Sequence, residues 1–539
     1  MPAGCWWKHG IVYQIYPRSF QDSNGDGIGD LNGITSRIDY LQHLGIDAVW
    51  ISPIYPSPMA DFGYDISDYC DVDPMFGTLE DFDALSREIK IRDLKLILDY
   101  VPNHTSNRHP WFLTSRNSRN NPKRDWYLWQ DPGPGGGPPN NWLSNFGGPA
   151  WTLDEHTGQY YCHSFLKDQP DLNWRNPEVR AAMYDVLRFW LRRGVDGFRI
   201  DVLYHLIKDD QWRDNPPNPD WQPGDSSSHR LLPLYTTDRP EVQDIVIEMR
   251  KVADEFSTTE SERVLIGELY LPIDRLMKYY GPCADGVLQG VQLPFNFHLI
   301  GAHWQAGAIG KIVRDYEAAL PAGAAPNWVL GNHDKPRIAS RIGLESAPLA
   351  AMLLLTLRGT PTLYYGDEIG MSDAAIAPNE VQDPFEKNEP GKGLGRDPER
   401  TPMQWSAAPQ AGFTTGIPWL PLGGGWPSRN VDALAADPRS LLALYRQLIA
   451  LRRREPALNS GSWAPLLADV DLLAYARVSG RRRLIVLLNF GAKDLTVPPD
   501  LLPRRIDILL STRLDRSGPF DGALTLQPLE GVVGAERDD

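Results

Sequence analysis

The sequence predicts an α/β fold: a parallel (β/α)8 TIM barrel with an inserted subdomain after strand 3 and a C-terminal antiparallel β domain. Eight short apolar runs rich in β-branched and aromatic residues alternate with amphipathic helical stretches. One interval between the third and fourth runs is too long for a connecting loop. After residue 457 the pattern changes to closely spaced strands. We place the barrel at 1–104 and 176–457, the inserted subdomain B at 105–175 and a C-terminal β-sandwich domain at 458–539.

Each predicted barrel strand is an apolar run bounded by polar or turn-forming residues. The eight runs are IVYQIYPRSF (11–20), AVWISPIY (48–55), LKLILDYVPNH (94–104), VDGFRID (195–201), RVLIGE (263–268), GVQLPFNF (290–297), NWVLGNHD (327–334) and GTPTLYYGDE (359–368). The stretches 33–45, 79–92 and 177–194 carry apolar residues every three to four positions, which predicts helices that bury one face. Strands and helices that alternate in this way are typical of a parallel barrel.

Three long segments interrupt this alternation. Residues 105–175 contain DPGPGGGPPNNW and scattered aromatic residues, which predicts the inserted subdomain. Residues 206–240 are rich in Pro, Asp and Ser, and residues 370–405 follow the eighth strand. A final helix is predicted within 440–457, before the β domain begins.

Composition excludes several classes of partner. The 539 residues are 42% hydrophobic and carry a formal net charge of −15, which argues against nucleic acid or an anionic membrane as the main partner. No apolar run of 18 residues predicts a membrane span, and the first residues lack the pattern of a secretory signal. The four cysteines are widely scattered, so we expect free thiols in a cytoplasmic protein. We expect a monomer or homodimer.

Carboxylates follow several predicted strands where the chemistry of a barrel is usually found. Asp201 ends one strand with Arg199 two residues earlier, so both side chains share a face and Arg199 should keep Asp201 ionised. Glu268 ends an otherwise apolar strand, where burial should raise its pKa, and Asp334 ends another. Cleavage of a glycosidic bond requires such a pair, one nucleophile or base and one acid.

Two histidines, His104 and His333, lie beside these carboxylates at strand ends. Neutral imidazoles there are suited to hydrogen bonds with sugar hydroxyl groups. A zinc site would require a paired arrangement such as HExxH, which the sequence lacks.

An oxygen-rich loop follows the first strand. Asp22, Asn24, Asp26, Ile28 and Asp30 alternate with glycines and a serine, as the ligands of a hard cation do in a tight loop. Position twelve is Gly33 and not Glu, so the loop is not an EF-hand. We expect structural calcium, or magnesium in its place, and no organic cofactor; the alternative is a solvated turn rich in Asp and Asn.

The motifs resemble a known family. DYVPNHTS (99–106), GFRIDVLYH (197–205), GE (267–268) and NHD (332–334) resemble, in order, the four signature regions of the α-amylase family of glycoside hydrolases, or family 13. QPDLNW (169–174) and RTPMQW (400–405) resemble its oligo-1,6-glucosidase and α-glucosidase branch. The resemblance spans nearly the whole chain.

The resemblance implies a role for each matching residue. Asp201 is implied to be the nucleophile, Glu268 the general acid and base, and Asp334 a residue that holds the sugar and distorts it. Tyr64 is implied to stack under the ring, while Asp61 and Arg400 grip the non-reducing end. The implied sugar-binding residues are Asp61, Tyr64, His104, Phe146, Phe165, Gln169, Arg199, His333 and Arg400.

These roles imply an exo-acting, retaining α-glucosidase that releases or transfers one glucose through a covalent intermediate. The partners implied are small α-glucosides together with water, alcohol or sugar acceptors. Val202, after the nucleophile, is typical of α-1,6-acting enzymes, whereas 206–240 and 267–281 resemble maltose-preferring α-1,4 enzymes that transfer glucose. We favour maltose-sized α-1,4 substrates and keep the oligo-1,6-glucosidase as the alternative.

Other members of the family remain as alternatives. A catalytically inactive binding homologue is disfavoured because all three carboxylates are present. A sucrose isomerase would carry an arginine-rich segment after NHD, where this chain has KPRIASR (335–341). An enzyme acting on a trehalose derivative would require a phosphate-binding basic cluster that the sequence does not point to.

Overall fold

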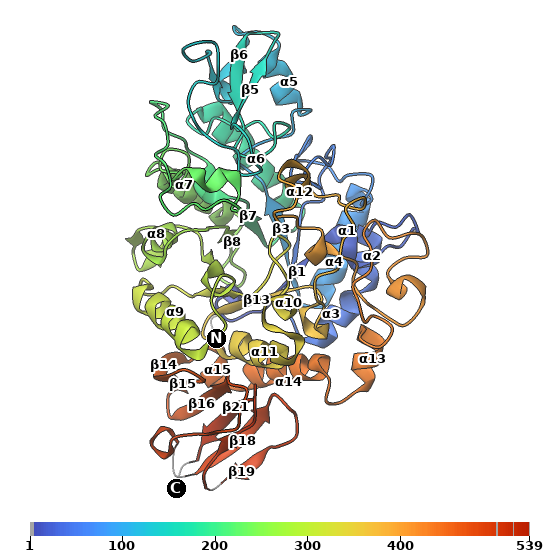
Figure 1. Cartoon of the computed structure of the whole chain (residues 1–539), viewed down its shortest axis with the longest axis vertical. Coiled ribbons are helices and arrows are strands. Elements are labelled where there is room, and N and C mark those ends of the chain that lie inside the picture. The colour runs from blue at the N-terminus through green and yellow to red at the C-terminus, as the bar shows by residue number, and fades with distance from the viewer. Residues whose placement is uncertain (1–4, 503–504, 521, 538–539) are drawn as a thin grey trace.

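The computed structural model describes residues 5–502, 505–520 and 522–537, and its main body is a closed parallel barrel (Figure 1). Its eight strands fall within the eight predicted runs. They are β1 (Val12–Ile15), β2 (Ala48–Ile51), β3 (Lys95–Tyr100), β7 (Gly197–Ile200), β8 (Val264–Gly267), β11 (Leu293–Asn296), β12 (Asn327–Val329) and β13 (Thr360–Tyr364). They pair in chain order and close through β13 against β1, which confirms the predicted fold class.

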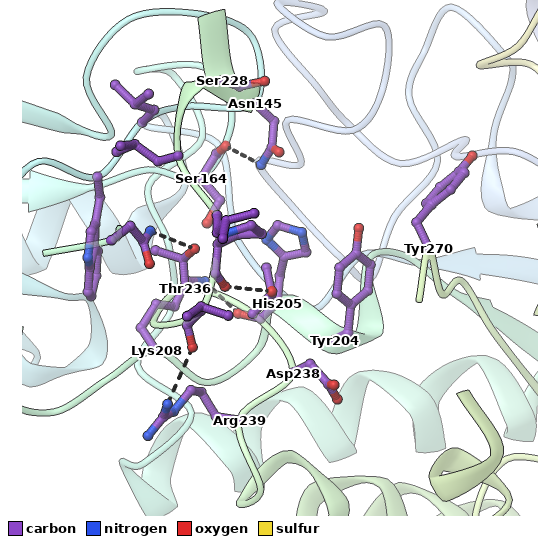
Figure 2. Close-up of a pocket in the computed structure, with 18 of the residues that line it drawn as sticks. Asn145, Ser164, Tyr204, His205, Lys208, Ser228, Thr236, Asp238, Arg239 and Tyr270 are labelled. Atoms are coloured by element: carbon purple, nitrogen blue, oxygen red, sulfur yellow. Dashed lines mark hydrogen bonds between the residues drawn. The ribbon is translucent and has the colours of Figure 1, made fainter. Parts of the chain in front are cut away.

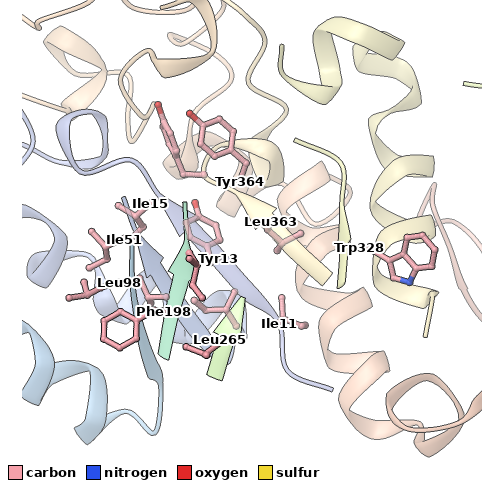
Figure 3. Packing of buried hydrophobic residues seen from close by; sticks show 14 of the residues in the cluster. Ile11, Tyr13, Ile15, Ile51, Leu98, Phe198, Leu265, Trp328, Leu363 and Tyr364 are labelled. Atoms are coloured by element: carbon pink, nitrogen blue, oxygen red, sulfur yellow. The ribbon is translucent and has the colours of Figure 1, made fainter. Parts of the chain in front are cut away.

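Alternation along the strands divides their side chains between two cores. Val12, Trp50 and Ile266 point into the barrel, where they pack together with Trp7 at its floor. Tyr13 and Leu98 belong to the larger core between strands and helices, part of which Figure 3 shows. Because neighbouring strand residues face opposite sides, an almost uninterrupted apolar run satisfies both cores.

Helices cover the outside of the barrel. They are α1 (Pro17–Phe20), α2 (Leu31–Ser36), α3 (Ile38–Leu44), α4 (Leu79–Ile91), α6 (Pro177–Arg192), α7 (Val242–Asp254), α8 (Ile273–Leu276), α9 (Ala306–Ala319), α10 (Ile338–Ile342), α11 (Ala347–Thr356), α12 (Pro384–Asn388), α13 (Val431–Ala436), α14 (Leu441–Arg454) and α15 (Pro456–Asn459). The single helix expected over 33–45 is wrong. The chain leaves helical geometry at Arg37, after α2 has begun at Asp30, whose side chain accepts from the Gly33 N–H.

Subdomain B is a small sheet that rises above the barrel (Figure 1). It contains α5 (Pro110–Arg116) and the strands β4 (Trp129–Gln130), β5 (Trp151–Asp154) and β6 (Gln159–Cys162). Loop 206–240 packs against it: Trp212 joins the small core around Trp142 and Trp151. The long loop is therefore anchored to subdomain B and not free in solvent.

The C-terminal domain is antiparallel, as predicted, and lies at the end of the molecule opposite to subdomain B (Figure 1). Its strands are β14 (Ser462–Ala468), β15 (Leu472–Ser479), β16 (Arg482–Asn489), β17 (Leu495–Thr496), β18 (Ile506–Ser511), β19 (Gly518–Phe520), β20 (Thr525–Leu526) and β21 (Gly531–Glu536); a hairpin of the barrel adds β9 (Cys283–Ala284) and β10 (Val287–Leu288). All four cysteines are free. Within the described ranges, every helix is too short or too polar to cross a membrane.

Candidate active site

A cavity of about 560 Å³ opens at the carboxyl ends of the barrel strands. Most of the predicted site residues line it, together with parts of loops 206–240 and 370–405. The predicted residues in its wall are Asp61, Tyr64, His104, Phe146, Phe165, Asp201, Glu268, His333 and Asp334. Gln169, Arg199 and Arg400 lie behind this wall and hold its members in place.

One buried guanidinium joins three carboxylates from three adjacent strands. Arg199 on β7 binds the Asp99 and Asp201 carboxylates at 2.7 Å each and that of Glu268 at 2.8 Å. Asp99 and Arg199 are paired across β3 and β7, so the strand register alone brings them together. Sequence reasoning missed Asp99, although a carboxylate within an apolar strand is a visible signal.

Burial dominates the protonation of this cluster. It raises the pKa of Asp201, and the contact with Arg199, which lowers that pKa, does not outweigh it. The contact with Arg199 acts in the expected direction, and an ionised Asp201 stays a prediction. Burial also raises the pKa of Glu268 and brings that of Asp99 to about 6. The carboxyl groups of Asp201 and Glu268 are hydrogen-bonded to each other, so they titrate as a pair.

The backbone after Asp201 is strained in a way that serves Glu268. Val202 has a positive φ of 35°, which is unfavourable for a β-branched residue. In this conformation its N–H donates to Oε2 of Glu268 at 2.8 Å. The turn thus fixes the orientation of Glu268 from the neighbouring strand.

Asp334 lies in a different electrostatic setting. Burial would raise its pKa, but the nearby guanidinium groups of Arg400 and Arg396 help to hold it below the usual range. Arg400 binds Oδ1 of Asp334 at 2.8 Å and donates to the carbonyl group of His333 at 2.7 Å. Asp334 therefore remains an anion beside a pair that shares protons.

The two histidines are neutral hydrogen-bonding groups. Burial lowers the pKa of His104 to about 4, and it also lowers the pKa of His333 well below its usual value. The Tyr64 ring stacks on His333 with centroids 5.4 Å apart, and its hydroxyl lies 2.6 Å from Nε2 of that ring. These rings form an apolar floor with polar edges, which suits a sugar ring.

Arg396, and not Arg400, contacts Asp61 at the closed end of the cavity. Its Nη2 binds Asp61 at 2.7 Å and Asp383 at 2.6 Å. Gln169, fully buried, donates to the other oxygen of Asp61 at 3.1 Å. Sequence reasoning did not single out Arg396, which lies four positions before Arg400 in GRDPER; the role implied for Arg400 at the non-reducing end stays a prediction.

Aromatic rings close the same end. The guanidinium of Arg396 lies 4.8 Å from the centre of the Phe146 ring, a cation–π contact. Phe146 also contacts Phe165 and Phe385, with ring centroids 5.6 and 5.1 Å apart. Subdomain B and loop 370–405 thereby join over the cavity.

The oxygen-rich loop lies at the start of the barrel, outside this cavity. Asp22 accepts N–H groups of Asn24, Gly25 and Gly27, and Asp30 caps α2. The donor set is chemically suited to calcium, but the loop as folded directs these carboxylates at its own amides. In the part of the chain that the structure describes, no three His, Cys, Asp or Glu side chains are arranged to hold a metal ion. Calcium binding stays a prediction.

Comparison with known proteins agrees with this geometry. The α-amylase catalytic domain model matches residues 14–461. The chain is 40% identical to an α-glucosidase of Culex pipiens, covering 98% of this chain and 90% of that one. It is 38% identical to an oligo-1,6-glucosidase of Parageobacillus thermoglucosidasius, covering 94% of each.

Solved structures match over the whole molecule. An α-glucosyl transfer enzyme superposes with a TM-score of 0.91 at 39% identity, covering 99% of both chains. The trehalulose synthase of Pseudomonas mesoacidophila gives 0.88 at 35% identity, covering 98% of this chain and 99% of that one. The chain therefore belongs to the α-amylase family and is a glycoside hydrolase.

Proposed function

We propose that this enzyme is a retaining, exo-acting α-glucosidase that releases or transfers one glucose from small α-glucosides such as maltose. The observation that carries the proposal is the carboxyl pair of Asp201 and Glu268, held by one guanidinium in the wall of a cavity that is closed beyond Asp61.

The spacing of the pair supports retention. Inverting enzymes separate their carboxyl groups by about 6.5–9.5 Å to admit a water molecule, whereas retaining enzymes hold them about 5–5.5 Å apart. Asp201 and Glu268 share Arg199 and a hydrogen bond, which favours the short spacing.

The chemistry follows in two steps. Asp201 attacks the anomeric carbon while Glu268 gives its proton to the glycosidic oxygen, which leaves a β-glucosyl ester. Glu268, now a carboxylate, takes a proton from water or an alcohol, whose oxygen attacks the anomeric carbon and frees Asp201. The raised pKa of Glu268 suits an acid that must hold its proton near neutral pH.

The closed end supports exo action. Asp61, Arg396 and Gln169 form a hydrogen-bonded barrier, and the Phe146 ring lies over it. A chain of glucose units has no room to continue past this barrier, so only the terminal, non-reducing glucose is bound there.

The preference for the α-1,4 bond over the α-1,6 bond is proposed from the named relatives and from the residues around the cavity. The named relatives include both α-glucosidases and oligo-1,6-glucosidases. Val202 favours the α-1,6 bond, and the long loop 206–240 favours small α-1,4 substrates. We give the loop more weight because three of its residues, Ser226, Ser228 and His229, line the cavity itself.

Sucrose isomerisation is the second candidate, because a trehalulose synthase is among the solved structures that match. The segment 335–341 argues against it. Arg337 is fully buried and donates to the carbonyl group of Tyr365, while Arg341 donates to those of Ile300 and Leu330. Both are committed to the backbone and not directed at an acceptor sugar.

A latch across the cavity supports restriction to disaccharides. We define it as Glu389 and Lys392 of loop 370–405 bound to residues 225–227 of loop 206–240. Glu389 accepts from the Ser227 N–H at 3.0 Å, and Lys392 donates to the Asp225 carbonyl at 2.8 Å. Since Ser226 and Gly393 also line the cavity, the latch joins the two loops at the cavity wall.

The latch can be opened without cutting the loop. The double variant Glu389→Gln, Lys392→Met should raise kcat/KM for maltotetraose relative to maltose by about fivefold, because it weakens the hydrogen bonds to charged groups that hold the two loops together. Glu386→Gln is the matched control, since that carboxylate binds Gly391 and Gly395 of its own loop. An unchanged ratio in the double variant would remove the disaccharide restriction from the proposal.

The activity itself is tested with maltose, isomaltose, sucrose and trehalose, with and without an alcohol acceptor. We expect maltose to be the best substrate and the first glucose released to be the α-anomer by NMR. Initial release of β-glucose would overturn retention, and a preference for isomaltose would favour the oligo-1,6-glucosidase.

A further inference from the structure

A chain of hydrogen bonds joins the interior of the barrel to the wall of the catalytic cavity. The side-chain Nε2 of Gln14, on β1, lies 2.7 Å from Nδ1 of His333. Nε2 of the His333 ring lies 2.6 Å from the Tyr64 hydroxyl group, which donates to Oδ2 of Asp99 at 3.0 Å. Four side chains from four separate segments are therefore connected end to end.

The position of one proton decides what the His333 ring offers to a sugar. Burial keeps His333 neutral, so one ring nitrogen carries a proton and the other accepts a hydrogen bond. Nδ1 faces the amide of Gln14, whereas Nε2 faces Tyr64 in the cavity wall. The ring donates toward the cavity if its proton is on Nε2, and it only accepts there if the proton is on Nδ1.

The Asp99 end of the chain fixes its direction. The Asp99 carboxyl group accepts hydrogen bonds from Arg199 at 2.7 Å, from Tyr64 at 3.0 Å and from Trp50 at 3.3 Å. Three donors around one carboxyl group favour the carboxylate, which can only accept. The proton of the Tyr64 hydroxyl group is therefore directed at Asp99.

The contact between Tyr64 and His333 then leaves one arrangement. Because the Tyr64 proton is used at Asp99, the Tyr64 oxygen must accept at the 2.6 Å contact, and Nε2 of His333 must carry the ring proton. Oδ2 of Asp334 lies 3.4 Å from the same nitrogen, and its negative charge favours the same form. Two carboxylates on different segments thus require Nδ1 to be the acceptor.

Gln14 supplies the donor that Nδ1 requires. Its Nε2 donates to Nδ1 of His333 and lies 3.4 Å from Oγ of Ser52. The side chain is fully buried, and among the described residues its Oε1 has no hydrogen-bond partner. Turning the amide over would let Oε1 accept a proton from Nδ1 but would leave Nε2 of the ring bare beside Tyr64 and Asp334. An unsatisfied buried oxygen opposes folding, so this orientation serves the imidazole and not the stability of the barrel.

We propose that Gln14 is a positioning residue whose amide N–H holds the proton of His333 on Nε2, so that the ring donates toward the glucose site. This proposal rests on the proposed α-glucosidase function, because the ring proton serves a hydroxyl group of the bound glucose. A hydroxyl group between Nε2 and Oδ2 of Asp334 accepts from the imidazole and donates to the carboxylate. Gln14 lies behind the cavity wall and acts only through the ring.

The first test examines the ring in the enzyme without substrate. In enzyme made with nitrogen-labelled histidine, NMR separates a ring nitrogen that carries a proton from one that accepts, and His333→Gln identifies the signals of this ring. We expect a protonated Nε2 and a bare, hydrogen-bonded Nδ1. A proton on Nδ1 would overturn the proposal whatever the activity. The expected ring form in an enzyme that cleaves none of the α-glucosides would overturn the proposed function alone.

Two variants at Gln14 test its part in the reaction. Gln14→Met keeps the length of the side chain without the donor, so the Nδ1 signal should move toward that of an imine nitrogen without a hydrogen bond. Its kcat should fall by about tenfold to a hundredfold, because the ring is no longer held in place. Gln14→Glu, assayed at mildly acidic pH where a buried glutamic acid keeps its proton, should recover at least about fivefold of that loss.

Gln292→Met is the matched control. Gln292 is also buried, and its amide bridges the Arg263 carbonyl group and the Leu265 N–H at 2.8 and 2.9 Å, away from His333. This variant should lower the melting temperature and leave both kcat and the Nδ1 signal unchanged. If Gln14→Met also keeps both, or if Gln14→Glu is no more active than Gln14→Met, Gln14 does not position the ring.

Discussion

The catalytic cavity and a second cavity of about 740 Å³, which adjoins it between subdomain B and loop 206–240 (Figure 2), share several residues but differ in how their charges are arranged. In the cavity, Asp99, Asp201 and Glu268 compete for Arg199, so buried negative charge exceeds positive charge around that residue. In the second cavity, Lys208, Arg239 and Arg275 each form one ion pair, with Asp171, Asp209 and Asp238. The first arrangement perturbs pKa values, and the second leaves each charge neutralised by a neighbour.

The two regions also differ in what positions them. Strand ends hold the reacting groups, and strand register fixes Arg199 beside Asp99. Subdomain B, loop 206–240 and the segment after β8 form most of the second cavity. The positions of the reacting groups therefore depend on the barrel, whereas the lining of the second cavity can change with the loops while the barrel stays the same.

The largest effect is expected from removing the nucleophile. Asp201→Asn should lower kcat by at least about 10⁴-fold, because the glucosyl ester can no longer form. The measurement is kcat with an aryl α-glucoside, with the melting temperature as the control for folding. Activity above about a hundredth of the original would assign the nucleophile elsewhere.

Removing the acid should sort substrates by leaving group. Glu268→Gln should cost about 10²–10⁴-fold with methyl α-glucoside and much less with p-nitrophenyl α-glucoside, which requires little protonation. The ratio of kcat/KM for the two substrates is the readout. Equal losses would mean that Glu268 positions the sugar and does not donate the proton.

A smaller effect is expected on the pH dependence of kcat/KM when one of the three carboxylates that bind Arg199 is neutralised. The charge of Asp99 raises the pKa of Asp201, and Asp99→Asn removes that charge and leaves Arg199 to the other two carboxylates. The pKa of the pair should therefore fall, and the alkaline limb of kcat/KM should move to lower pH by about half a unit to one unit. An alkaline limb at an unchanged or higher pH would contradict the coupled titration of Asp201 and Glu268.

The smallest effect lies outside both cavities. If the loop containing Asp26 binds calcium, adding calcium after chelation should raise the melting temperature by a few degrees, since a ligand at about 100 times its Kd stabilises the fold by about 2.7 kcal/mol. Asp26→Ala should abolish the shift. The same melting temperature with chelator and with calcium would leave the loop as a hydrogen-bonded turn.

The sequence predicted the barrel well because strand runs and rim carboxylates are local patterns. It could not predict which segments meet. Glu389 and Ser227 are 162 positions apart, and Arg396 and Asp61 are 335 apart, so both contacts depend on how loops fold back over the barrel. The division of 33–45 was missed for local reasons: the cap at Asp30 starts α2 early, and the backbone leaves helical geometry at Arg37.

The cluster around Arg199 has a consequence for the engineering of this protein. Folding must assemble an excess of buried carboxylates before any substrate arrives, so the barrel rim opposes the stability of the rest of the fold. Natural selection retains such a rim for turnover. Replacing the rim carboxylates by neutral residues should abolish turnover and raise the melting temperature. Such a variant would be a heat-stable protein that binds glucose without cleaving its substrate.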